Sequence, residues 1–502
     1  MKNTILLILC AAMLATLSPA SAAPTMDAVM TRAGATYPSQ LDPSLARPQL
    51  IDLPPTSRND EDLPCGGLRV GDIEPAPLET RTALGNADWY EQGDGSRIAR
   101  LELRSEFATG LRVQLENLAG MELRIYDPEG LSVFGPYVNP TLAEDGTFWS
   151  TVIFGEKIGL EFRVLPGLSL SRNLPEILSV AYLFGEFDRG DRWPPAGTCD
   201  EDINCYPTWA GSTEDDAVGL MLFNCDDSGC GQCTGAMLNR TGSDFAPIFM
   251  TARHCISTQA TASTLIVFWE FETDTCDGTD PPLNGQPRND GSQLLKTHYD
   301  SEWTLLGLWQ NSLATAYLGW DPNYFANGST TTGVSHPGGM TKRISFGEKI
   351  GDDSCLGADE WLIQHSLGRT FPGASGSPLY DSSRRVRGTL SCDNRECPDE
   401  TDSYAEYGRM DVGFPVIRWY IHDMYNPAYV NGALSGDPGN DGDSERGNST
   451  QPFNTVYESA FSVPSGGTVY IDPDNYDETF TIRRPMTLRR WGTSGTVVIG
   501  AP

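Results

Sequence analysis

Short runs in which apolar and polar residues alternate dominate residues 98–187 of the chain. Leu111-Arg112-Val113-Gln114-Leu115 and Leu123-Arg124-Ile125-Tyr126 place every second side chain on one face, which is the period of a half-buried strand. Turn signals such as Asp127-Pro128-Glu129-Gly130 separate these runs. The pattern predicts an antiparallel β-sandwich, and this region carries no cluster of catalytic residue types.

The first residues have the pattern of a secretory signal. Lys2 supplies a positive start, Ile5–Leu17 an apolar stretch and Ala20-Ser21-Ala22 a small-residue cleavage site. We therefore expect residues 1–22 to be a signal peptide of a secreted, extracellular protein. The apolar stretch is too short for a permanent membrane span, and no later segment of the sequence reaches that length.

Composition divides the remainder of the chain. We expect residues 23–192 to be a propeptide that contains the sandwich, with a permanent N-terminal module as the alternative. A cysteine-rich domain follows at 193–428, and residues 429–450, rich in Gly, Asp, Asn and Ser, read as a flexible acidic linker. Residues 451–502 remain as a C-terminal module.

That module resembles the opening of a right-handed parallel β-helix. The residues that carry the resemblance are Gly467-Thr468-Val469-Tyr470-Ile471, Tyr476-Asp477-Glu478-Thr479 and Pro485-Met486-Thr487-Leu488. One or two coils are too few to bury a solenoid core, so we interpret the segment as a small accessory or attachment module. A surface or a polysaccharide is the binding partner expected for this module.

Charge and composition narrow the functional classes. The formal net charge of −32 opposes binding to nucleic acid or to an anionic membrane surface, because a polyanion is repelled by both. The 52 glycines and 35 prolines, together with few periodic apolar helices, favour a β-rich architecture.

Ten of the 12 cysteines fall between Cys199 and Cys397. In an exported protein an even number in one stretch predicts a disulfide-stapled domain. Zinc is the alternative, because Cys230-Gly231-Gln232-Cys233 has the spacing of a metal-binding pair. No second pair or nearby histidine pair completes four ligands, so we expect neither a metal nor a cofactor.

Two motifs carry candidate chemistry. Thr251-Ala252-Arg253-His254-Cys255 places His254 beside a cysteine that can hold its turn rigid, as a general base requires. Pro372-Gly373-Ala374-Ser375-Gly376-Ser377-Pro378 exposes Ser375, a candidate nucleophile, on a tight turn of small residues. The N–H groups of Gly373 and Ser375 can converge there on a developing oxyanion.

These motifs resemble the histidine and serine motifs of chymotrypsin-like (trypsin-like) peptidases, and residues 196–425 resemble the bacterial lysyl endopeptidase branch. Further matching stretches are Gly197-Thr198-Cys199, Cys233-Thr234-Gly235, Ser335-His336-Pro337, Lys342-Arg343-Ile344-Ser345 and Tyr407-Gly408-Arg409. The resemblance implies an all-β fold with a chymotrypsin-like double β-barrel. It implies a secreted serine endopeptidase, made as a precursor, that acts on proteins or peptides through an acyl-enzyme. The alternative is a catalytically impaired adhesion or binding protein on the same fold.

The resemblance also implies an acid that orients His254. The family places this acid in a strand that here reads Ser301-Glu302-Trp303-Thr304-Leu305-Leu306, so Glu302 stands at the acid position. Asp300, two residues away and expected on the same strand face, is the rival.

The substrate pocket departs from the family pattern. The two positions where the family carries pocket acids correspond here to Phe371 and Ala405, and neither bears a charge. Arg369 at the pocket base would repel a cation if it pointed inward, whereas Glu406 could compensate if the register were shifted by one residue. Strict specificity for lysine is therefore not expected, and an apolar or unassigned preference before the scissile bond is favoured.

Disulfide pairing also follows from the resemblance. The family pattern implies three bonds: Cys233–Cys255, Cys205–Cys276 and Cys199–Cys397. Two further bonds, Cys225–Cys230 and Cys355–Cys392, are hypotheses for the cysteines that remain.

Overall fold

The computed structural model describes the following residues of the chain: 25–26, 28–30, 48–54, 63, 66–129, 132–143, 145–167, 174–184, 199–225, 229–242, 244–394, 403–432, 445–478, 480, 482 and 484–500. The expected signal peptide, most of the expected linker and Cys397 lie outside these residues.

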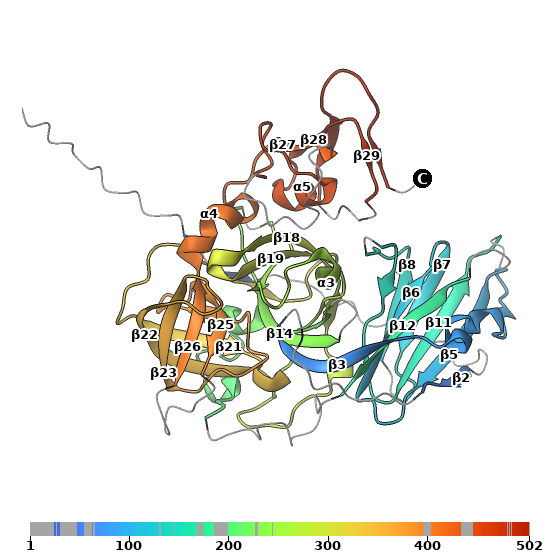
Figure 1. Cartoon of the computed structure of the whole chain (residues 1–502), viewed down its shortest axis with the longest axis horizontal. Coiled ribbons are helices and arrows are strands. Elements are labelled where there is room, and N and C mark those ends of the chain that lie inside the picture. The colour runs from blue at the N-terminus through green and yellow to red at the C-terminus, as the bar shows by residue number, and fades with distance from the viewer. Residues whose placement is uncertain are drawn as a thin grey trace, which may run out of the picture.

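The N-terminal domain consists of two facing β-sheets that enclose an apolar core (Figure 1). Alternation along the strands produces this core: Leu111, Val113 and Leu115 are fully buried, as the period of two requires. One sheet contains β2 (Gln49–Asp52), β4 (Tyr90–Glu91), β5 (Arg97–Arg104), β7 (Met121–Tyr126), β8 (Val133–Val138) and β11 (Lys157–Val164). The other contains β3 (Leu68–Pro75), β6 (Gly110–Glu116), β9 (Phe148–Trp149), β10 (Ile153–Phe154) and β12 (Glu176–Leu183).

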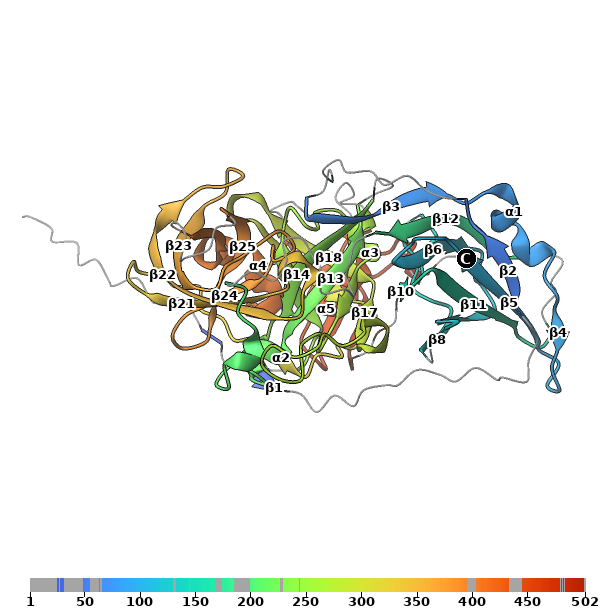
Figure 2. The same cartoon turned by 90° about the horizontal axis from the view of Figure 1, so that it is seen from below.

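Strand β3 joins this domain to the next. It pairs antiparallel with β12 through Gly71–Pro75 and with β14 (Cys230–Met237) through Leu68–Gly71. The second sheet of the sandwich therefore continues without interruption into the following domain, as the blue ribbon of β3 shows in Figures 1 and 2.

The following domain contains two barrel-forming sheets. The first sheet contains β13 (Val218–Asn224), β14, β15 (Ile248–Ala252), β16 (Ile266–Phe268), β17 (Arg288–Asp290), β18 (Ser292–His298) and β19 (Trp303–Leu308). The second is a closed barrel of β21 (Thr330–Ser335), β22 (Arg343–Asp353), β23 (Glu360–Leu367), β24 (Pro378–Tyr380), β25 (Val386–Asp393) and β26 (Tyr404–Arg409). Short β20 (Ala316–Tyr317) pairs with β1 (Val29–Met30). The predicted all-β architecture with two barrels is confirmed.

Helices are few and short. Among the described residues the longest helix is α4, which runs over Met410–Ile421. The others are α1 (Leu78–Arg81), α2 (Thr213–Asp216), α3 (Gln259–Ser263) and α5 (Val456–Ser462), with 3-10 turns at Ala83–Gly85, Ile203–Cys205, Leu283–Gly285, Tyr299–Ser301 and Pro337–Gly339. Among the described residues, none of the helices has the length and apolar character needed to cross a membrane.

The C-terminal module packs on the first barrel sheet. Its strands pair in parallel: β28 (Thr468–Ile471) lies between β30 (Thr487–Arg490) and β27 (Ala428–Val430), and β29 (Asn475–Tyr476) pairs with β31 (Val498–Ile499). Strand β27 precedes the expected module, so residues 429–430, expected to begin a flexible linker, form part of a strand instead. Phe453 and Val456 are fully buried in the same apolar core as Trp303 of the barrel. This shared core explains why the module in Figure 1 lies directly on α4 and β18.

Candidate active site

The histidine turn follows β15 directly. Cys255 is bonded to Cys233 of the adjacent strand β14, and the N–H of Arg253 donates to the Glu302 carbonyl over 2.9 Å. The turn is thus fixed on both sides. The side chain of His254 keeps 17% of its surface exposed, so the imidazole is accessible although its backbone is held.

Glu302 is the carboxylate that meets the histidine. Its Oε2 lies 2.9 Å from Nδ1 of His254 and also accepts the backbone N–H of that residue over 3.1 Å. The side chain of Glu302 is 2% exposed, so this interaction is shielded from water. Asp300, the rival, is exposed, and its backbone carbonyl accepts the N–H of Asp359 over 2.6 Å.

The expectation that Asp300 and Glu302 share a strand face is wrong. Tyr299–Ser301 form a 3-10 turn, and Glu302 then adopts a left-handed conformation with φ 53° before β19 begins at Trp303. A glutamate disfavours this conformation, by ~1–2 kcal/mol, because its Cβ crowds the carbonyl oxygen. The turn sends the carboxylate toward the histidine instead of along the strand.

Gly408 of β26 makes room for this turn. A Cβ on Gly408 would lie 2.0 Å from the Ser301 carbonyl oxygen and 3.2 Å from Cβ of Glu302. The indole N–H of Trp303 donates to the Gly408 carbonyl over 2.9 Å. Because Gly408 has no side chain, the turn that carries Glu302 can pack closely against β26 of the second barrel.

Ser375 lies in the loop between β23 and β24. Its carbonyl accepts the N–H of Thr234 over 2.8 Å and lies 3.8 Å from Sγ of Cys255, which brings the serine and histidine turns into contact. Within the described part of the chain, no hydrogen bond joins the Ser375 hydroxyl to His254, a common state of such pairs before substrate binds.

The oxyanion candidates are held by bonds to their carbonyls. Thr234 Oγ1 donates to the Gly373 carbonyl over 2.9 Å, and the N–H of Gly338 donates to the Pro372 carbonyl over 2.7 Å. Among the described residues, the N–H groups of Gly373 and Ser375 donate no hydrogen bond to a protein acceptor. Two backbone donors are thus available beside the serine hydroxyl.

Arg369 is neutralised by a residue that the sequence did not single out. Its guanidinium binds both carboxylate oxygens of Asp200, Nε to Oδ1 at 2.8 Å and Nη2 to Oδ2 at 3.0 Å. The Asp200 side chain is fully buried and Arg369 is 9% exposed. A bidentate pair of this kind is geometrically specific, so Arg369 is paired with Asp200 rather than presenting an uncompensated charge.

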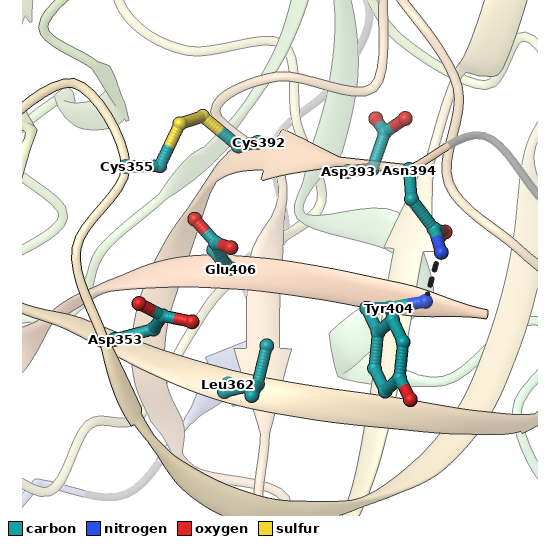
Figure 3. Close-up of a pocket in the computed structure, with 8 residues that line it drawn as sticks. All are labelled: Asp353, Cys355, Leu362, Cys392, Asp393, Asn394, Tyr404 and Glu406. Atoms are coloured by element: carbon teal, nitrogen blue, oxygen red, sulfur yellow. Dashed lines mark hydrogen bonds between the residues drawn. A yellow bond between two sulfur atoms is a disulfide. The ribbon is translucent and has the colours of Figure 1, made fainter. Parts of the chain in front are cut away.

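The register of β26 separates Ala405 from Glu406. Ala405 is buried inside the second barrel with Ala374 and Leu390, next to the serine turn. Glu406 faces the opposite side and lines a pocket of about 400 Å³ with Asp353 and the Cys355–Cys392 disulfide (Figure 3). Glu406 therefore does not take the place of the missing acid at Ala405.

A buried carboxyl group lies beside that pocket. Burial, and then the charge of Glu406, raise the pKa of Glu360 to about 8, although hydrogen bonds from Ser391 and the Cys355 N–H oppose the shift. Burial likewise raises the pKa of Glu406 itself. Two adjacent carboxyl groups in low dielectric cannot both ionise readily, so Glu360 keeps its proton at neutral pH.

Three predicted disulfides are present: Cys205–Cys276, Cys233–Cys255 and Cys355–Cys392. Cys199 is disulfide-bonded, while Cys397, its predicted partner, lies outside the described residues. The Cys225–Cys230 hypothesis is wrong, because Cys225 is bonded and Cys230 is a buried free thiol. Burial raises the pKa of Cys230 to about 12, which makes the thiol unreactive.

The Cys233–Cys255 disulfide also removes the thiolates that a metal ion beside His254 would need. Cys233, His254 and Cys255 bring ligand-type atoms within 4.8 Å of one another. Both sulfurs are consumed in the Cys233–Cys255 bond, so neither is available as a thiolate ligand. This group serves to hold the imidazole.

Sequence reasoning missed Asp200 and Gly408. Asp200 follows Cys199 in a short stretch of acids, and nothing local distinguishes it from its neighbours. Gly408 stood inside a stretch quoted for its resemblance, and a glycine in a strand is a signal of close backbone approach.

Two family models of known proteins match this chain, one over the domain with the two barrels and one over the N-terminal domain. Residues 194–408 match the family model described as lysyl endopeptidase, C-terminal domain, and residues 47–183 match lysyl endopeptidase N-terminal domain. A lysyl endopeptidase of Pseudomonas aeruginosa is 30% identical over 362 residues, covering 64% of this chain and 75% of that protein.

Solved structures resemble the chain more distantly. The HtrA-type protease AlgW with a tripeptide is 16% identical, covers 43% of this chain and 64% of its own, and has a TM-score of 0.30. The serine endoprotease from Yersinia pestis is 13% identical, with coverages of 43% and 67% and a TM-score of 0.30.

Proposed function

This chain belongs to the lysyl endopeptidase family and is a serine endopeptidase, and from that premise we propose that Ser375, His254 and Glu302 form its catalytic triad. The observation that carries the proposal is the 2.9 Å contact between Nδ1 of His254 and Oε2 of Glu302. With Nδ1 engaged, Nε2 is the ring nitrogen left to take the proton of Ser375.

The mechanism assigns one task to each group. Ser375 Oγ attacks the scissile carbonyl while His254 accepts its proton, and the N–H groups of Gly373 and Ser375 stabilise the oxyanion. His254 returns the proton to the leaving amine, and water then hydrolyses the acyl-enzyme with His254 again acting as base. Glu302 holds the imidazole tautomer and stabilises the imidazolium that forms.

We further propose that the enzyme is secreted as a precursor whose N-terminal domain is its propeptide. The signal-like residues 1–22 and the match of residues 47–183 to the family's N-terminal domain support this. We also propose that the enzyme is not strictly specific for lysine before the scissile bond. The Arg369–Asp200 pair and the uncharged Ala405 offer no free carboxylate for a buried ammonium.

The test uses a serine-directed fluorophosphonate and a peptide library with Ser375→Ala and Ser377→Ala. We expect Ser375→Ala to lose labelling and to lower kcat by roughly 10⁶-fold, and Ser377→Ala, in the same turn, to keep the label. Label on another residue, or hydrolysis that survives Ser375→Ala, refutes the triad. Cuts confined to positions after lysine refute the proposed specificity.

A further inference from the structure

Two glycines of the N-terminal domain lie against the histidine turn. A Cβ on Gly66 would be 2.8 Å from the His254 carbonyl oxygen and 3.1 Å from Cδ2 of its ring. A Cβ on Gly67 would be 3.3 Å from Sγ of Cys233, in the disulfide that holds the turn. Both glycines have left-handed φ angles, 77° and 80°, so the chain reaches the imidazole in a form that other residues disfavour.

Strand β3 continues this contact along β14. Leu68 pairs with Gln232 and Arg69 with Gly231 in an antiparallel register. Two residues beyond Gln232, the N–H of Thr234 binds the carbonyl of Ser375. Strand β14 therefore carries β3 on its first three residues and the serine turn near its middle, so an extended peptide on this edge adjoins both catalytic groups.

The position of β3 identifies which part of a substrate it displaces. Arg369, Phe371 and Ala405, where the family binds the residue before the scissile bond, belong to the second barrel and the loop that precedes Ser375. A peptide that runs from this pocket past Ser375 therefore continues, beyond the scissile bond, toward the first barrel. The edge of β14 and the Cys233–Cys255 disulfide form that side, and Gly66, Gly67 and β3 already cover them.

The domain interface holds β3 in place. Arg112 of β6 is 2% exposed and donates to the Thr264 carbonyl over 2.9 Å and to Asn224 Oδ1 over 3.2 Å, both on the protease side. In return, Arg288 of β17 donates to the Val152 carbonyl over 2.9 Å. Because these bonds are buried, a single cut between the domains does not by itself release β3.

We propose that Gly66, Gly67 and β3 form a built-in plug on the leaving-group side of the cleft. The plug closes the unprocessed enzyme to peptides that extend beyond the scissile bond while Ser375 remains reactive toward small substrates. The inference rests on the proposed triad. It predicts that the unprocessed chain discriminates between substrates by their length after the scissile bond.

The experiment uses the intact full chain, with its mass verified after each assay. Two substrates share the residues before the scissile bond: one ends there in a chromophoric amide, and the other continues for several residues. Gly66→Ala and Gly67→Ala push Cβ atoms into the turn. Gly167→Ala is the matched control, because Gly167 has a similar φ of 86° and nothing within 4 Å of its Cβ.

Because the Cys233–Cys255 disulfide and the Glu302 contact hold the histidine turn, the plug should yield to the added methyl groups. We therefore expect all four proteins to react with the fluorophosphonate at Ser375 at similar rates. Relative to the amide, the extended peptide should be cleaved about tenfold faster by either plug variant than by the wild type or Gly167→Ala, equivalent to ~1.4 kcal/mol. Equal ratios in all four proteins would overturn the plug and leave the triad intact. Failure of Ser375 to react in every protein would instead overturn the triad, and the plug with it.

Discussion

The two barrels of the protease domain differ in how closely they follow the pattern of their family. The first barrel holds His254 and Glu302, the proposed base and acid, in a shielded hydrogen bond. The second barrel lacks acids at Phe371 and Ala405 and pairs its pocket-base arginine with Asp200. The proposed base and acid therefore lie on the first barrel, whereas Ser375 and the residues of the substrate pocket lie on the second. The pocket can thus change while the pair of His254 and Glu302 is kept.

The largest expected effect tests the first barrel. Glu302→Gln preserves the shape of the side chain but removes the charge that holds the imidazole tautomer, so kcat should fall by about 10³–10⁴-fold. Asp300→Asn, two residues away on the exposed side of the turn, should leave kcat unchanged. Steady-state kinetics on a small amide measure both, and a reversed order of effects would transfer the acid's role to Asp300.

Asp200→Asn tests the second barrel. The substitution takes the anionic partner from a guanidinium that is 9% exposed, and breaking a buried ion pair in this way costs ~3–5 kcal/mol. Glu176→Gln provides the control, because its pair with Arg81 is exposed and should contribute less than ~1 kcal/mol. Urea denaturation gives both values. Similar losses in the two variants would mean that the Arg369–Asp200 pair is not a buried structural element.

Gly408→Ala tests how far the barrels depend on each other. The added methyl group would press on the Ser301 carbonyl and displace the turn that carries Glu302, at a cost of ~1–3 kcal/mol. We expect kcat on the small amide to fall roughly tenfold, since 1.36 kcal/mol of barrier is tenfold in rate. Gly351→Ala, on β22 with open space around it, should have normal activity. Normal activity in Gly408→Ala would show that the position of Glu302 does not depend on this contact with the second barrel.

The smallest effect concerns pH. Glu360 has a pKa of about 8 in the folded chain against an ordinary value of 4.5, so the native state binds the proton more tightly than the unfolded state. Its contribution to stability is full below pH 4.5 and is lost as the pH rises through about 8.

Glu360→Gln should remove this loss. The melting temperature of the wild type should therefore fall relative to that of the variant between pH 5 and pH 8, by ~4 °C or less per kcal/mol in a chain of this size. Glu348→Gln, exposed on the neighbouring strand β22, should run parallel to the wild type. Differential scanning calorimetry measures the melting temperature of all three proteins. Parallel curves of melting temperature against pH would show that Glu360 does not cause the loss of stability.

Much of the architecture was predictable because it follows from short-range patterns. Alternation over residues 98–187 identified the sandwich strands, and a base beside a half-cystine and a serine among small residues identified the two turns. The bonds Cys205–Cys276 and Cys233–Cys255 followed from the resemblance. The other two pairings were hypotheses for the cysteines that remained: Cys355–Cys392 is present, whereas Cys225–Cys230 is wrong.

The sequence by itself determined the chemistry that this chain carries, since the turns around His254 and Ser375 are built from neighbouring residues whose backbone preferences act locally. Only the tertiary structure decided which carboxylate meets the imidazole, 48 residues along the chain, and which acid neutralises Arg369, 169 residues away. It also decided that β3 lies beside the catalytic turn. Such contacts depend on how whole sheets pack and curve, and no local pattern of apolar and polar residues encodes that geometry.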